Sequence, residues 1–151
     1  MTRKEAREFM MQVFFQMEAC GDFDVNSRPE YMNTKKLGLQ QDYCSELHSL
    51  LCNKKGTLDE MLNRYSANWK IERLPKTDLA VLRLAACEIL YMEDLPDAVS
   101  INEAVELSKK YGAENSTKYV NAILGKIVEE KSAGKSATCT DADSTGEGSD
   151  A

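Results

Sequence analysis

Residues 115–119 place an amide, two hydroxyl groups, a cation and an aromatic ring side by side in the chain. They are Asn115, Ser116, Thr117, Lys118 and Tyr119. Asn and Ser are typical of helix N-termini, and apolar residues follow at helical spacing, so a helix is predicted to begin here. The free N–H groups of a helix start attract anions, and an aromatic ring can stack on an unpaired base. This stretch is therefore a candidate contact for a phosphate or a nucleobase.

A second group of cations, Arg3, Lys4 and Arg7, lies at the start of the chain. Positive charge at a helix N-terminus opposes the helix dipole, so helix stability does not explain the cluster. A role in binding is one interpretation, and a merely solvated helix start is the other. Glu5 lies within the cluster and weakens its attraction for phosphate.

Cys44, His48 and Cys52 share one helix face and resemble a metal site. Eight residues of helix rise about 12 Å, whereas zinc holds its ligands at about 2.3 Å. One helix therefore cannot bring both cysteines to one ion. His48 is the only histidine, and there is no Cys-x-x-Cys, phosphate-binding loop or dinucleotide fingerprint. No catalytic residue, metal or cofactor is predicted.

The formal net charge of −6 is shared between two unlike parts of the chain. Residues 132–151 hold one Lys and four acids, which leaves −3 for the remainder. A mildly acidic body argues against general duplex binding but permits a local basic site. The five cysteines show no framework spacing, and no apolar run of about 18 residues occurs. We expect a cytoplasmic protein with reduced thiols and no membrane span.

The first predicted helix spans 3–20, and its core face comprises Ala6, Phe9, Met10, Val13, Phe14 and Met17. Arg7, Met11 and Phe15 form a second line on an adjacent face. This line predicts either a widely buried helix or, because large apolar groups beside a cation often mark contacts, a surface for a partner.

Three further stretches before residue 95 show helical spacing, separated by polar or turn-rich segments. A loop is predicted over 21–36, and a helix over 37–54 with Leu39 in its apolar pattern; Lys55 and Gly56 end that helix. Thr57 and Glu60 form a capping box for the next helix. The link at 66–75 contains Trp69, Ile71 and Leu74, which are predicted to be buried. Residues 76–92 are apolar on most sides and predict a central helix.

Residues 95–128 predict a hairpin of two helices with a polar connection. Ser100 and Glu103 form a capping box for the first, and Gly112 follows its last turn. Residues 132–151 lack large apolar side chains and predict a disordered acidic tail.

Several motifs resemble the NusB family of bacterial transcription antitermination factors. The resemblance covers residues 3–130. It includes Arg3-x-x-Ala6-Arg7-Glu8, Trp69-x-x-Glu72-Arg73-Leu74-Pro75, Asp78-x-Ala80-x-Leu82-Arg83 and Glu88-x-Leu90-Tyr91. The longest block is Ile101-Asn102-Glu103-Ala104-Val105-Glu106-Leu107-x-Lys109-x-Tyr111-Gly112, continued by Ser116-x-Lys118-Tyr119-Val120-Asn121.

The resemblance implies an all-α fold of two packed three-helix bundles, with about seven helices and subdomains at about 1–73 and 74–131. It also implies a non-enzymatic role. Family members bind the boxA element of nascent RNA together with NusE, a ribosomal small-subunit protein. The pair helps to assemble an antitermination complex on RNA polymerase, chiefly during ribosomal RNA synthesis.

The resemblance assigns roles to residues at matching positions. The RNA contacts are Arg3, Lys4, Arg7, Asn115, Ser116, Lys118 and Tyr119. The partner contacts are Met11, Phe15 and Asp78. The family commonly has Asp at position 115, and Asn removes a negative charge from an RNA-binding surface. Two alternatives remain: an adaptor that binds only protein, and an accessory domain for an RNA methyltransferase. This chain shows no glycine-rich cofactor-binding region, so it is not expected to be that enzyme.

Overall fold

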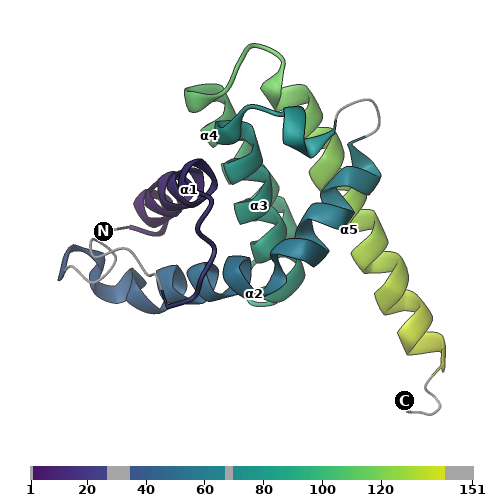
Figure 1. Ribbon diagram of the computed structural model, residues 1–151. Coiled ribbons are helices and arrows are strands. Elements are labelled where there is room, and N and C mark those ends of the chain that lie inside the picture. Colours follow the sequence, from purple (N-terminus) through teal and green to yellow (C-terminus); the bar gives the residue numbers. More distant parts are fainter. Residues whose placement is uncertain (1, 27–34, 67–69, 142–151) are drawn as a thin grey trace.

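The computed structural model describes residues 2–26, 35–66 and 70–141. Within these residues the chain forms five α-helices, two short 3-10 helices and no strand (Figure 1). In order they are α1 (Arg3–Cys20), η2 (Lys35–Gln40), α2 (Gln41–Tyr65), η3 (Ile71–Arg73), α3 (Lys76–Tyr91), α4 (Asp97–Tyr111) and α5 (Ser116–Asp141). The all-α class is confirmed. The predicted seven helices in two three-helix bundles do not match the five α-helices of the described residues.

The lower helix count arises chiefly because α2 is continuous. It passes without a break through Gly56, where the sequence predicted an end, and Thr57 begins no new helix. Leu58 and Leu62 are fully buried, so packing on the core outweighs the roughly 1 kcal/mol that glycine costs within a helix. The start of the predicted helix also differs, because residues 37–40 belong to η2 and Leu39 is 97% exposed rather than part of the core.

The predicted capping box at Ser100 is also absent. Helix α4 begins at Asp97, directly after Pro96, and Ser100 is a buried residue inside it. A capping box does occur at α1, where Thr2 Oγ1 accepts from the Glu5 N–H at 3.1 Å and Glu5 Oε1 accepts from the Thr2 N–H at 2.7 Å. The same residue pattern thus caps one helix and lies inside two others.

Helix α3 forms the centre of the molecule and contacts α1, α2, α4 and α5. Every residue from Asp78 to Ile89 is buried. Figure 1 shows α3 between α1 and α5. The predicted core face of α1 is confirmed, with Phe9 half-buried and the other members buried. The division into subdomains 1–73 and 74–131 stays a prediction.

The remaining segments meet the predictions in part. Ile71 and Leu74 are buried in the link, as predicted, whereas Trp69 lies outside the described residues. Helix α5 continues past the predicted tail boundary at residue 132 to Asp141, and its last turns extend away from the other helices in Figure 1. Residues 27–34 of the predicted loop and 142–151 of the tail also lie outside the described residues. None of the described helices is both long and apolar enough to span a membrane.

Candidate nucleic-acid interface

The connection between α4 and α5, residues 112–115, is called the elbow here. It packs closely against the start of α3. A Cβ at Gly112 would lie 2.6 Å from Ser116 Oγ and 2.7 Å from Asp78 Oδ1, so the elbow has room only for glycine at this position. The backbone of Gly112 has φ −91°, and the requirement is therefore close packing rather than an unusual backbone angle.

Asp78 holds the start of α5 against the start of α3. Its Oδ2 accepts hydrogen bonds from Ser116 Oγ, at 3.0 Å, and from the Tyr119 hydroxyl. Ser116 Oγ also accepts from the Ala113 N–H at 2.8 Å. Asp78 and Ser116 are fully buried, and Asp78 lies in the first turn of α3, where a carboxylate favours the helix dipole. The network fixes the elbow relative to the central helix.

This network changes the expected roles of three candidate residues. Tyr119 is only 8% exposed, and its ring does not offer the free face that stacking on a base requires. The pKa of Tyr119 is raised to about 12, chiefly by burial and secondly by the hydrogen bond to Asp78. Ser116 and Asp78 are buried as well, so neither presents a side chain to a partner in this conformation.

Asn115 and Lys118 are the exposed candidates at the elbow. Both side chains lie at the surface at the beginning of α5. Lys118 takes part in none of the ion pairs found in the described part of the chain. A cation without a carboxylate partner, placed at the positive end of a helix, is well suited to meet an anion.

Arg7 is buried, which contradicts its expected place at the surface. Arg7 Nε donates to Glu88 Oε2 at 2.9 Å, and the Tyr43 hydroxyl donates to the same oxygen. Ser100 Oγ donates to Glu88 Oε1 at 2.8 Å. The carboxylate of Glu88 therefore joins α1, α2 and α4 to α3. Burial lowers the pKa of Arg7, but the hydrogen bond and charge of Glu88 outweigh it and the pKa is raised.

Arg3 and Lys4 lie at the surface but in different surroundings. Lys4 is exposed and lines a shallow hollow between α1 and α4. Arg3 is half-buried; its Nε donates to Gln40 Oε1 at 2.6 Å, and its guanidinium lies 4.1 Å from the centre of the Tyr43 ring. Arg3 therefore contacts η2 and α2 rather than the elbow.

Helix α1 approaches the elbow through its middle rather than its start. Glu8 accepts from Lys110 Nζ at 2.7 Å and from the Tyr111 hydroxyl at 2.5 Å, and Gln12 donates to Tyr111 at 3.4 Å. Lys4 lies two turns before Gln12, about 12 Å by helical rise. The last turns of α4, which carry Lys109 and Lys110, therefore lie between the two basic clusters.

Of the two predicted apolar partner contacts on α1, one is exposed. Phe15 is 37% exposed, whereas Met11 is 1% exposed and belongs to the core. The second line of α1 is therefore mixed: Arg7 and Met11 follow the buried-helix interpretation, and Phe15 remains available at the surface.

The cysteine and histidine pattern on α2 does not form a metal site in the described part of the chain. His48 Nε2 and Cys52 Sγ lie 3.9 Å apart, while Cys44 is fully buried. Among the described residues, no group of three or more His, Cys, Asp or Glu side chains could hold a metal ion.

The comparisons with known proteins decide the family. The model of the NusB family matches residues 4–129, most of the chain. The chain belongs to the NusB family. It is 40% identical over 132 residues to the transcription antitermination protein NusB of Alkaliphilus oremlandii, covering 87% of this chain and 96% of that protein. It is 38% identical to the Agathobacter rectalis protein of the same name, covering 84% and 99%.

A solved structure of a NusB protein supports the fold as well. The T. maritima NusB structure superposes with a TM-score of 0.74 at 32% identity, covering 86% of this chain and 92% of that one. In this chain, the NusB fold positions the elbow, α1 and the buried carboxylates Asp78 and Glu88 relative to one another. The Glu88 network could not be predicted from the spacing of the residues alone. The sequence does contain one sign of this network: Glu88 is a charged residue inside an otherwise apolar helix, and buried charges are normally paired.

Proposed function

We propose that this NusB-family protein is a transcription antitermination factor that binds boxA-type single-stranded RNA together with NusE. In this role it supports ribosomal RNA transcription as part of an antitermination complex on RNA polymerase in the cytoplasm. The role is non-enzymatic. Relatives at 33–40% identity carry the name transcription antitermination protein NusB. The observation that carries the RNA proposal is the exposed Lys118, without an ion pair in the described residues, next to Asn115 at the start of α5.

The proposed RNA surface follows α4 from one basic cluster to the other. Lys4, Asn115 and Lys118 contact RNA directly. Lys109 and Lys110, which are 62% and 61% exposed, lie between these ends and add positive charge along the path. Single-stranded RNA is flexible enough to follow such a line, and its phosphates gain from each cation they meet.

The buried candidates support this surface without touching RNA. Ser116 and Tyr119 fix the elbow through Asp78, and Arg7 fixes α1 through Glu88. This division of roles separates two effects of mutation. Substitution of a surface cation weakens RNA binding in the folded protein, whereas substitution of a buried supporting residue lowers the stability of the fold.

A partner is expected because the surface carries few cations. The carboxylates of Glu8 and Glu106 neutralise Lys110 and Lys109 in part. A second protein that extends the positive surface would increase the number of phosphate contacts. Phe15, exposed on α1, is the proposed apolar contact for NusE, since large exposed aromatic groups are favoured at protein interfaces.

The test measures fluorescence anisotropy of a labelled boxA-like RNA and of its scrambled counterpart, each with and without NusE. Binding should prefer boxA, tighten with NusE and weaken with salt. Lys118→Ala should flatten the plot of log K against log salt concentration by about 0.7, the contribution of one phosphate contact on a single strand. Lys126→Ala is the matched control, because Lys126 is an exposed lysine two turns further along the same helix.

The proposal fails if the wild-type protein shows no preference for boxA over scrambled RNA even when NusE is present. If Lys118→Ala and Lys126→Ala give equal slopes of log K against log salt concentration, Lys118 does not contact RNA. Asn115→Asp provides an independent check, since the added negative charge should weaken binding without altering the fold.

A further inference from the structure

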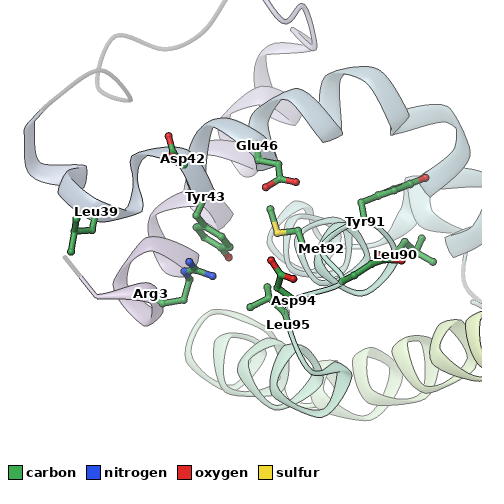
Figure 2. Close-up of a pocket in the computed structure, with 11 residues that line it drawn as sticks. Arg3, Leu39, Asp42, Tyr43, Glu46, Leu90, Tyr91, Met92, Asp94 and Leu95 are labelled. Atoms are coloured by element: carbon green, nitrogen blue, oxygen red, sulfur yellow. The ribbon is translucent and has the colours of Figure 1, made fainter.

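A groove on the side of the molecule away from the elbow carries an unusual combination of side chains. It lies between the start of α2 and the segment that follows α3, and it forms a hollow of about 650 Å³. Four carboxylates surround it, Asp42, Glu46, Glu93 and Asp94, and its apolar walls include Leu39, Tyr43, Leu90, Met92 and Leu95. We call it the acidic groove. Figure 2 shows Glu46 and Asp94 pointing toward the space around Met92.

The four carboxylates of the acidic groove are all exposed. None of them takes part in the ion pairs found within the described residues, although acids elsewhere in the protein do, such as Glu130 with Arg64 and Asp97 with Lys131. Arg3 is the one cation among the lining residues, and it is directed onto the ring of Tyr43 and to Gln40. Lys54 lies beside the groove, 5.9 Å from the centre of the Tyr91 ring. The groove therefore presents an excess of negative charge to whatever approaches it.

The apolar part of the acidic groove is also exposed at its edge. Leu39 is 97% exposed, the highest value among the exposed large apolar side chains of the described residues. Figure 2 places it at the rim, on the same side as Arg3 and Tyr43. Isolated exposed apolar residues are common, but this one lines the same hollow as the half-buried Leu90 and Leu95. The combined surface suits an occupant with an apolar side chain.

The charge of the groove decides the class of occupant. Four carboxylates repel the phosphates of RNA. A single metal ion is also unsuited, because no three of the acidic, Cys or His side chains in the described residues are grouped closely enough to hold one. Carboxylates spread around an apolar hollow instead match several separate cations that flank an apolar group. Lysine and arginine side chains on a protein segment have this arrangement.

We propose that the acidic groove docks a short basic segment of a partner protein. One apolar side chain of that segment packs beside the exposed Leu39 at the edge of the hollow, and flanking Lys or Arg side chains pair with Glu46 and Asp94. The proposal also assigns Arg3 to the wall of this groove rather than to the RNA surface. It does not depend on the proposed RNA function.

The test uses fluorescein-labelled hexapeptides and the full-length protein, with anisotropy as the readout. The probe is Lys-Lys-Leu-Leu-Lys-Lys, and its comparison peptides replace the leucines by serines or the lysines by glutamates. The double variant Glu46→Gln/Asp94→Asn should bind the probe about 3- to 10-fold more weakly than wild type, as expected for two exposed ion pairs. The matched control is Glu72→Gln/Glu129→Gln, which removes two exposed carboxylates elsewhere and should bind like wild type.

Leu39→Ser tests the apolar contact without risk to the core, because the side chain is exposed. It should weaken binding of the leucine probe about threefold and leave the serine peptide unchanged. Equal loss of affinity in the groove variant and the control variant would overturn the proposal, as would equal binding of the leucine and serine peptides to wild type. If instead the groove variant gains affinity for single-stranded RNA and keeps its affinity for the probe, the groove borders an RNA path.

Discussion

Replacement of Arg7 by methionine separates a structural role for this cation from a role in RNA binding. Arg7 and Glu88 have side chains that are 6% and 1% exposed, and the change removes one partner of this buried pair. Loss of one partner from a buried ion pair costs about 3–5 kcal/mol, since the remaining charge stays in the interior. The hydroxyls of Tyr43 and Ser100 still donate to Glu88, so the expected loss lies near the lower value, about 3 kcal/mol.

The assay is urea denaturation followed by far-UV circular dichroism, together with a thermal melt. At about 2–4 °C for each kcal/mol in a chain of this length, the melting temperature should fall by about 6–12 °C. Lys4→Met is the matched control, because Lys4 is exposed one turn earlier on the same helix. Its stability should stay within about 0.5 kcal/mol of wild type, while its RNA affinity falls.

The opposite pattern would refute the reasoning. If Arg7→Met unfolds at the same urea concentration as wild type and loses more RNA affinity than Lys4→Met, Arg7 contacts RNA at the surface. The assignment of the Glu88 network as a structural support would then be wrong.

Three further changes follow from other contacts. Tyr119→Phe removes a donor to buried Asp78, whose other oxygen has no hydrogen-bond partner among the described residues. The change should lower stability by about 1–3 kcal/mol in urea denaturation, and an unchanged midpoint would contradict the network. Gly56→Ala should stabilise the protein by about 0.5–1 kcal/mol, because α2 is continuous and the space beside it is open; destabilisation would favour a break there. Hydrogen bonds from Lys110 and Tyr111 lower the pKa of Glu8, so its contribution is present above pH 4.5 and is lost as pH falls through the lowered pKa. Glu8→Gln should therefore reduce the loss of stability in acid, measured by melts across this range.

Helix type and core faces could be predicted from the sequence because they depend on local periodicity. The bounds of α1 and the buried face of α5 follow directly from the spacing of their apolar residues. Helix starts were less predictable. Among the described residues, a Ser or Thr followed three residues later by Glu occurs at Thr2, Thr57 and Ser100. Only the first caps a helix, because the other two lie where tertiary packing continues the helix.

The candidate site was predictable only in its exposed part. Lys4, Asn115 and Lys118 are at the surface, as their polarity suggests. The burial of Arg7 depends on Glu88, which lies 81 positions away in the chain, and no local pattern reveals that pairing. Likewise, the burial of Tyr119 depends on Asp78, 41 positions away in the chain, which accepts a hydrogen bond from the Tyr119 hydroxyl.

The burial of α3 has a consequence for how ligands at its two ends can influence one another. Asp78 supports the elbow at one end, and Met92 lines the acidic groove just past the other, a separation of about 21 Å by helical rise. Because α3 contacts all four other helices, tilting or sliding it would disturb the whole core. The coupling free energy between elbow and groove should then be close to zero. RNA at the elbow and a basic segment in the groove would bind additively, and each would leave the dissociation constant of the other unchanged.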